Sequence, residues 1–227
     1  MKQKPAAAAP SRLLTTMISH AVPDYREPSP ARNEGHLIDV THRRSGNDVV
    51  EVGFDISSAP VPPRHYVAEV CFVDVNDGHL RLVFGQRALG IGEELESAIV
   101  IRLSPHAAHN FVDLIFGMTH PGLEAIAATM NIAPTPLLSS ITRPVHVAHL
   151  AANMAAVGVS GYESCLDFYQ TSPFAMKHIE KKKQIGVEPV VRVNLSTGLL
   201  LSLASEAKSL VANFPPRLFI GGQDARL

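Results

Sequence analysis

The sequence has few cysteines and little net charge. Its two cysteines, Cys71 and Cys165, are too few to build a disulfide framework. Both lie in stretches with the apolar pattern of strands, so we interpret them as small buried apolar residues of a protein in a reducing compartment. The formal net charge of −1 at pH 7 gives no general attraction to nucleic acid or to an anionic membrane.

A long hydrophobic run is also missing. No stretch of about 18 apolar residues occurs, so we expect no transmembrane helix and no membrane partner. The basic start, Met1 to Ala6, is not followed by the apolar core of a signal peptide, which favours a cytoplasmic protein. A cleaved organelle transit peptide is the alternative, because the first acidic residue is Asp24. Five prolines within the first 30 residues disfavour the amphipathic helix of such a peptide.

Three regions of the chain differ in composition. Residues 1–35 are rich in proline and alanine, which predicts a disordered tail with one short helical turn near Leu13–Ile18. Residues 36–133 and 134–227 each contain strand-like stretches followed by a helix-like stretch, and we assign them as two units. At 227 residues the chain is long enough for two small domains or one large one.

One stretch of the chain occurs twice. Residues 150–170 align without a gap on residues 66–86, which lie 84 positions earlier, and six of the 21 positions are identical. The identical pairs are Ala68/Ala152, Val73/Val157, Val75/Val159, Leu82/Leu166, Phe84/Phe168 and Gln86/Gln170. We interpret the match as an internal duplication.

The first copy has the pattern of three strands and a helix. Two apolar stretches, which we expect to be strands at about 66–75 and 79–85, flank Asn76-Asp77-Gly78. Asp-Gly between such stretches is typical of a hairpin turn. After a third strand at residues 99–103, Ser104-Pro105 matches a helix N-cap followed by proline at the first helical position. The helix must bury its apolar stripe on a sheet, because so short a helix is marginal alone in water. A separate hairpin over residues 37–56 precedes this copy.

The second copy repeats this order. We expect strands at about 145–159, 162–170 and 190–195, and a helix after Ser196-Thr197. The sequence therefore predicts an α+β fold in which two related units, each a small antiparallel sheet with one helix, pack together as a pseudo-dimer. Strands that are apolar on both faces, such as residues 67–75, indicate contact with a second sheet or subunit. We therefore expect self-association as a homo-oligomer or a stable polypeptide partner.

The second copy also contains a short motif. Asn153 is followed by Glu163, Asp167 and Phe168, and then by an apolar strand that ends in Asn194-Leu195-Ser196 before a leucine-rich helix. This arrangement resembles a small prokaryotic domain family of unknown function, whose members read Tyr-x-Asn, Glu-x-x-Leu-Asp-Phe-Gly and Leu-Ser-Pro. The resemblance marks these four residues as the family motif of the chain.

The copy departs from the family pattern at two positions, with Tyr169 in place of the glycine and Thr197 in place of the proline. The order of strands and helix is also similar to the SecB-like export-chaperone fold. That similarity implies a protein that binds other polypeptides. The family carries no known active site, so the resemblance implies no catalytic residue.

The histidines are the first candidates for a chemical site. His106 and His109 are spaced i, i+3, and so are His146 and His149. Zinc needs three or four converging ligands, and neither cysteine completes such a set. We therefore predict no metal ion and no other cofactor. His65 and His149 occupy equivalent positions of the two copies, which favours a structural role.

The two acidic residues of the motif are the candidates for catalysis. Glu163 and Asp167 are four apart on a strand and share a face, as a general acid/base pair in a pocket would require. The alternative is structural: the two acids fix a turn or pair with Arg192 on the neighbouring strand. We favour the structural role, lean against enzyme activity and assign no catalytic residue.

A local basic patch is the candidate for a partner site. The loop after the second strand of the second copy carries Lys177, Lys181, Lys182 and Lys183. No aromatic residue beyond Phe174 accompanies them, so base stacking is not indicated. A solvated loop is the simpler interpretation, and contact with a partner or with nucleic acid is the alternative.

These patterns favour a non-catalytic protein-interaction module, an adaptor or chaperone-like binder of polypeptide segments. A nucleic-acid-associated protein that uses the lysine loop is one alternative, and an enzyme that uses Glu163 and Asp167 is another. The three classes differ in what they require: an exposed apolar groove, a basic loop that binds nucleic acid, or a pocket that contains both acids.

Overall fold

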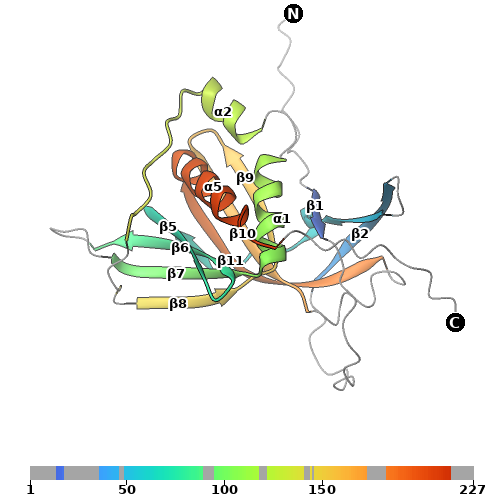
Figure 1. Ribbon diagram of the computed structural model, residues 1–227. Helices are drawn as coiled ribbons and strands as arrows, with labels where there is room; N and C mark the ends of the chain where they lie inside the picture. The colour runs from blue at the N-terminus through green and yellow to red at the C-terminus, as the bar shows by residue number, and fades with distance from the viewer. Residues whose placement is uncertain are drawn as a thin grey trace, which may run out of the picture.

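The computed structural model describes residues 14–17, 36–45, 49–88, 95–117, 122–140, 144, 146–172 and 183–215. Within these residues the strands form two sheets, and the long helices pack against both of them (Figure 1). Most neighbouring strands are antiparallel, and two strand pairs are parallel. The predicted α+β class is confirmed.

The first sheet contains four strands in the order β5 (Val70–Asn76), β6 (His79–Arg87), β7 (Leu95–Leu103) and β8 (His146–Ala151). A tight turn joins β5 to β6, and its Asp77 and Gly78 have φ angles of 50° and 71°. Asp-Gly suits this turn because both positions need positive φ, so the predicted hairpin is confirmed. Alternate side chains of β6, Leu80, Leu82 and Phe84, are buried in the core.

The second sheet contains seven strands. Its centre is formed by β9 (Met154–Ser160), β10 (Glu163–Gln170) and β11 (Gln184–Ser196). Its extension at one end is formed by β2 (His36–Ser45), β3 (Val49–Asp55) and β1 (Leu14–Met17). The short strand β4 (His65–Val67) pairs with β11 on the same side as the extension.

The central strands of the two sheets pair in corresponding registers. In the first sheet Val70 faces Gly85, and all seven pairs of the β5–β6 ladder follow from that register. In the second sheet Met154 faces Tyr169, and each pair of the β9–β10 ladder lies 84 positions after its counterpart. The third strands, β7 and β11, then lead into helices in both units.

One strand of each unit lies in the sheet of the other unit. The sequence predicts single strands at residues 66–75 and 145–159, but the chain leaves its ladder after Val67 and again after Ala151. As a result β4 pairs in parallel with β11, and β8 pairs in parallel with β7. Both predictions of one continuous strand are wrong, because apolar periodicity does not reveal where a backbone changes ladders.

Two long helices follow the third strands, α1 (Pro105–Phe116) and α5 (Thr197–Val211). Each begins at a serine N-cap: the Ser104 hydroxyl accepts a hydrogen bond from the Ala107 N–H (3.3 Å), and the Ser196 hydroxyl accepts one from the Leu199 N–H (3.2 Å). The predicted helix start at Ser104-Pro105 is confirmed. No helix in the described part of the chain has the length and apolar character needed to cross a membrane.

The long helices pack mainly across the boundary between the units. Helix α1 contacts β9, α5 contacts β5, and the two helices contact each other. At the centre the Phe168 ring lies 6.0 Å from the ring of Phe84 and 6.2 Å from that of Phe111, and all three are buried. The sequence places each helix on its own sheet. The structure shows one continuous core instead, because the apolar face of each helix also contacts the other unit.

The hairpin of β2 and β3 extends the second sheet. Ile38 of β2 faces Ile185 of β11, and both pack with Phe54, Met154 and Tyr169 in a separate small core. The sequence-based division at residue 133 groups this hairpin with the first unit, whereas its hydrogen bonds connect it to the second. Order along the chain does not determine which sheet an early hairpin joins.

Strand β1 lies inside the stretch for which the sequence predicts a tail. Its Leu14 faces Asp55 of β3 in an antiparallel ladder. A helical turn at these four residues is therefore a wrong prediction, because the edge of β3 offers backbone partners that an isolated turn lacks. The rest of the predicted tail, 1–13 and 18–35, lies outside the described residues.

Helix α2 (Leu123–Thr129) leads into an irregular segment, residues 130–140, which we call the strap. The strap crosses the start of α5, where the Thr135 N–H donates to the Gly198 carbonyl (2.9 Å). It then reaches β5, where the Leu138 N–H donates to the Cys71 carbonyl (2.9 Å). The strap thereby joins the helix of the second unit to the edge of the first sheet.

Candidate functional site

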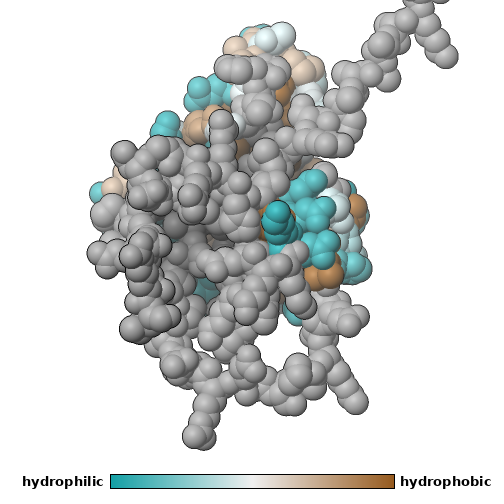
Figure 2. Space-filling view, turned by 90° about the vertical axis from the view of Figure 1, so that its right-hand side faces the viewer, coloured by the Kyte–Doolittle hydropathy of each residue, from teal (hydrophilic) through white to brown (hydrophobic). Residues whose placement is uncertain are grey.

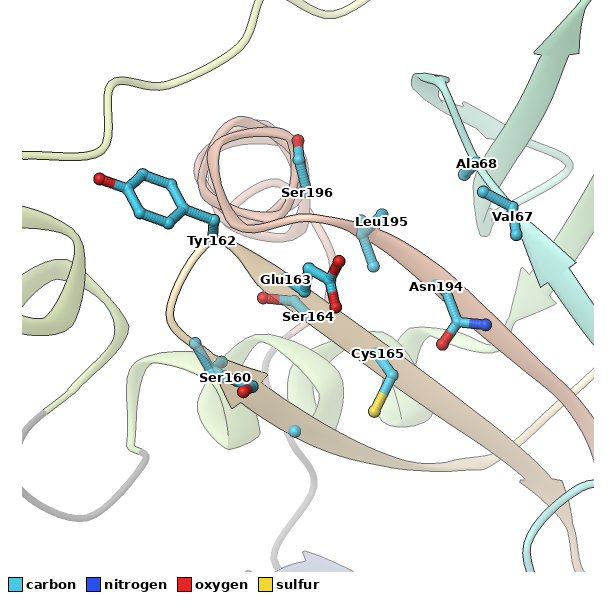
Figure 3. A pocket seen from close by; sticks show the side chains of 12 residues that line it. Val67, Ala68, Ser160, Tyr162, Glu163, Ser164, Cys165, Asn194, Leu195 and Ser196 are labelled. Carbon is cyan, nitrogen blue, oxygen red and sulfur yellow. The ribbon is translucent and has the colours of Figure 1, made fainter. Parts of the chain in front are cut away.

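An open groove of about 660 Å³ lies beside the turn between β9 and β10 (Figure 3). It extends across β10 and β11 to β4. Its lining residues are Val67, Ala68, Gly158, Val159, Ser160, Tyr162, Glu163, Ser164, Cys165, Asn194, Leu195 and Ser196. The groove is therefore built by three strands of the second sheet and by the exchanged strand of the first unit.

Strand alternation determines which side chains line the groove. Leu166 and Val193 point into the core, so Cys165 and Asn194 beside them point to the opposite face of the sheet. In Figure 3 the side chains of Glu163, Cys165 and Asn194 project from neighbouring strands around one space. The outer face of this sheet carries the groove.

The groove is hollow because the sheet carries small residues where the first sheet carries an ion pair. In the first sheet Asp74 faces Arg81, and the guanidinium donates to both carboxylate oxygens, with Nε–H to Oδ1 at 2.6 Å. The corresponding residues of the second sheet are Gly158 and Cys165, which face each other in the same register. A Cβ at position 158 would lie 3.0 Å from Cys165 Sγ.

The groove combines one charge with apolar and amide groups. Glu163 is the only charged residue among its described lining residues. Val67 and Tyr162 lie at its rim with 54% and 62% of their surface exposed. The Tyr162 hydroxyl donates to the Met130 carbonyl of the strap (3.2 Å), so the ring is held in place. The groove therefore presents an apolar rim beside an acidic and an amide group.

Cys165 is not activated as a nucleophile. Partial burial raises the pKa of its thiol, and the nearby Asp167 carboxylate raises it further. The thiol therefore stays protonated at neutral pH, whereas nucleophilic cysteines have lowered pKa values. The prediction of two buried cysteines holds fully for Cys71, whose thiol pKa burial also raises, while Cys165 is only partly buried.

The two acids of the motif are not brought together. Arg192 donates from Nε and Nη2 to the two carboxylate oxygens of Asp167, both at 2.6 Å, which is one of the two structural roles predicted for it. Hydrogen bonding to Asp167 raises the pKa of Arg192. Glu163 is exposed and lines the groove, and four residues of strand separate the two acids by roughly 13 Å. Among the described residues the groove is lined by Glu163 and not by Asp167, so its geometry favours the structural role over the alternative of an acid/base pair.

Asn153 closes the end of the β9–β10 ladder. Its side-chain carbonyl accepts from the Thr171 N–H (2.9 Å), and its amide donates to the Thr171 carbonyl (2.8 Å). The equivalent residue of the first sheet is Glu69, whose carboxylate accepts from the Arg87 N–H at 2.9 Å. Asn153 therefore has a structural role at a chain crossing.

Replacing Asn153 with alanine is expected to lower the free energy of unfolding by about 1–3 kcal/mol, because it removes two hydrogen bonds and leaves Thr171 backbone groups without them. Chemical denaturation measures this change. Asn153→Asp is the matched variant, since a carboxylate keeps the acceptor, as Glu69 does, but loses the donor. A smaller loss is expected for it, and equal losses would contradict the proposed division of roles.

Sequence reasoning missed the role of Thr197. Its buried hydroxyl donates to the Gly161 carbonyl (2.6 Å) and contacts the Ser164 hydroxyl (2.8 Å). Its N–H donates to the Tyr162 carbonyl (2.8 Å). Proline at this position, as in the family pattern, would remove all three contacts. Thr197 therefore holds the β9–β10 turn that borders the groove.

The lysine loop is described at one residue only. Lys183 is exposed, has a φ of 52° and directly precedes β11. Lys177, Lys181 and Lys182 lie outside the described residues. Contact of this loop with nucleic acid or a partner stays a prediction from charge alone.

The histidines do not converge in the described part of the chain, where no three His, Cys, Asp or Glu side chains are grouped to hold a metal ion. His109 contacts the Pro215 carbonyl through Nε2 (3.2 Å) and lies edge-on to Phe214. His65 on β4 and His149 on β8 are both exposed and occupy matching positions of the exchanged strands.

Exposed hydrophobic residues are scattered over the described surface. Figure 2 shows one face, on which the described residues form a largely hydrophilic area with small hydrophobic patches. The large apolar residues with high exposure are Leu37, Val61, Val67, Val75, Met130, Val147 and Tyr162. Val67 and Tyr162 are brought together at the rim of one groove.

No protein-family model matches the sequence, and no curated protein or solved structure matches it significantly. The resemblance to the small prokaryotic family and to SecB-like chaperones therefore stays a prediction. The functional argument depends on the geometry of the groove and on the residues that line it.

Proposed function

We propose that this protein is a non-catalytic interaction protein that binds a polypeptide segment in the groove over Gly158 and Cys165. The groove itself is the observation that carries this proposal, because the outer face of a sheet is hollowed and bordered by exposed Val67 and Tyr162. Among the described lining residues the only thiol, Cys165, has a raised pKa, and Glu163 is the single acid.

The shape and chemistry of the groove favour a polypeptide over a small metabolite. Small-molecule sites bury most of their ligand, whereas this groove is open along its length and suits a chain that continues beyond it. The side-chain amide of Asn194 has both a donor and an acceptor, as a peptide group does. Apolar rim residues favour apolar side chains, and Glu163 favours a basic one.

The chain architecture is part of this proposal. The equal registers of the β5–β6 and β9–β10 ladders and the equivalent serine caps support a tandem duplication that packs as a pseudo-dimer. In this arrangement the Asp74–Arg81 ion pair occupies the face of one unit, and Gly158 and Cys165 leave the other open. Within the described residues the hollow over this register therefore belongs to one unit and not to the other.

Filling the groove tests the proposal. The double variant Gly158→Asp, Cys165→Arg copies the Asp74–Arg81 pair into a ladder of identical register, so the fold is expected to persist. We expect the wild-type chain to retain members of an array of 12-residue peptides, preferentially basic-apolar ones, and the double variant to lose at least tenfold in affinity by fluorescence anisotropy.

The first sheet supplies the matched control. Asp74→Asn, Arg81→Gln removes the charges of a partly buried ion pair, keeps side chains of similar size on the first sheet and leaves the groove of the second sheet unchanged. This variant is expected to bind peptides as the wild type does. Wild-type protein that retains no peptide, or a filled groove that still binds at full affinity, would rule out the groove as the binding site.

A further inference from the structure

Strand β8 forms one edge of the first sheet in the described part of the chain. It is the outermost strand of that sheet (Figure 1), and no described strand pairs with it on the side away from β7. All of its residues except Leu150 are exposed. Its sequence, His-Val-Ala-His-Leu-Ala, contains no Lys, Arg, Asp, Glu or Pro, which are the residues that usually keep an edge from pairing.

The neighbouring edges are protected in ways that β8 is not. The opposite edge of the first sheet, β5, receives the Leu138 N–H of the strap at Cys71 and carries the charged Asp74. The counterpart of β8 in the second sheet, β4, has only three residues and follows Pro62 and Pro63. Another edge of the second sheet, β9, is uncharged as well, but most of its residues are buried or half-buried. An uncharged edge on which all residues but one are exposed is therefore specific to β8 among these edges.

The backbone of β8 presents an ordered row of donors and acceptors. The Ala152 N–H donates to the Arg102 carbonyl of β7 (3.3 Å), so the even-numbered residues direct their backbone groups towards β7. Backbone groups alternate along a strand, so Val147, His149 and Ala151 direct theirs away from the sheet. These three residues are the ones that an added strand would meet.

We infer that β8 pairs with β8 of a second copy of this chain, antiparallel and about a two-fold axis at His149. In this register Val147 of one copy faces Ala151 of the other, and the two His149 residues face each other. Val147 and Ala151 are small, and no Lys, Arg, Asp or Glu lies along the pair. The two four-stranded sheets become one sheet of eight strands. The contact is self-complementary, so assembly stops at two copies.

A second copy fits this edge better than an unrelated strand does. The free edge ends at Ala151, because Ala152 is buried at the crossing into the second sheet. The five residues centred on His149 pair with the same five residues of the second copy. Each outward-facing backbone N–H among them then has a carbonyl partner. The inference does not depend on peptide binding, since the groove lies in the other sheet.

Cysteine cross-linking tests the register. Directly opposed residues that exchange both hydrogen bonds have Cα atoms ~5.5 Å apart, a separation that a disulfide spans. Purified full-length His149→Cys is expected to form a covalent dimer under mild oxidation. His146→Cys, equally exposed on the same strand but outside the five paired residues, is expected to stay unlinked. Linking of both variants alike, or of neither, overturns the proposed pairing.

Charge repulsion provides an independent measurement. The wild type is expected to sediment as a dimer at about 100 µM, and His149→Lys, which places like charges directly opposite each other, is expected to raise the dimer dissociation constant at least tenfold. His146→Lys is the control and is expected to keep the dimer. A monomeric wild type, or a His149→Lys protein that remains dimeric, overturns the inference. Unchanged thermal unfolding shows that the variants fold.

Discussion

Replacing Phe168 with alanine is expected to lower the free energy of unfolding by about 3–5 kcal/mol, the usual cost of removing a buried phenylalanine ring. Phe168 is fully buried and contacts the rings of Phe84 and Phe111. Its neighbours come from both sheets and from α1, so the cavity has rigid walls and cannot collapse easily. Urea denaturation followed by circular dichroism measures the loss.

Phe84 is the matched residue of the first sheet. It is equally buried, and its ring lies 6.0 Å from that of Phe168 at an angle of 55°. Phe84→Ala is expected to cost a similar amount. The double variant should cost less than the sum, with a coupling of about 0.5–3 kcal/mol, because the rings contact each other. Additive losses would show that the two units do not share one core.

Replacing Gly198 with alanine is expected to lower the free energy of unfolding by about 1–3 kcal/mol, as overpacking does. Helix propensity alone predicts the opposite sign, since alanine is favoured over glycine by up to about 1 kcal/mol. The strap decides the outcome: a Cβ at position 198 would lie 2.5 Å from the Ala133 carbonyl oxygen and 2.7 Å from Thr135 Oγ1. The backbone of the strap must therefore shift.

Ser202→Ala, one turn later on α5, is the control for this variant. Ser202 is half-buried, and its hydroxyl makes only a long hydrogen bond to the Gly198 carbonyl (3.4 Å). Its replacement is expected to change stability by no more than about 0.5 kcal/mol. If Gly198→Ala were the more stable protein in the same denaturation experiment, the strap would not pack on α5 as described.

Local features of the fold were predictable from the sequence. Asp77-Gly78 requires positive φ at adjacent positions, and Ser104-Pro105 supplies a cap and a preset first turn, so neighbouring residues alone determine both. The buried positions of Leu82, Phe84 and Leu166 follow from alternation. The strand exchange was not predictable, because residues 65–67 have the same apolar pattern whichever sheet they join.

The candidate site was predictable only in part. The acidic residues were found from the motif, and the pairing of Asp167 with Arg192 was one of two expected roles. The groove was not predicted because it depends on two small side chains that face each other across neighbouring strands. Gly158 and Cys165 lie on different strands, and only the register that places them opposite each other makes a hollow. A comparison with Asp74 and Arg81 at matching positions was the signal that could have found it.

The sequence by itself determined the α+β class, the helix starts and the alternation of buried and exposed residues, because these depend on interactions within a few residues of the chain. The tertiary structure decided which sheet β4 and β8 join, where α1 and α5 pack and where the second sheet is hollow. Those outcomes depend on contacts between residues far apart in the chain. Several pairings can satisfy the same local pattern, and only the packing of the whole core selects one.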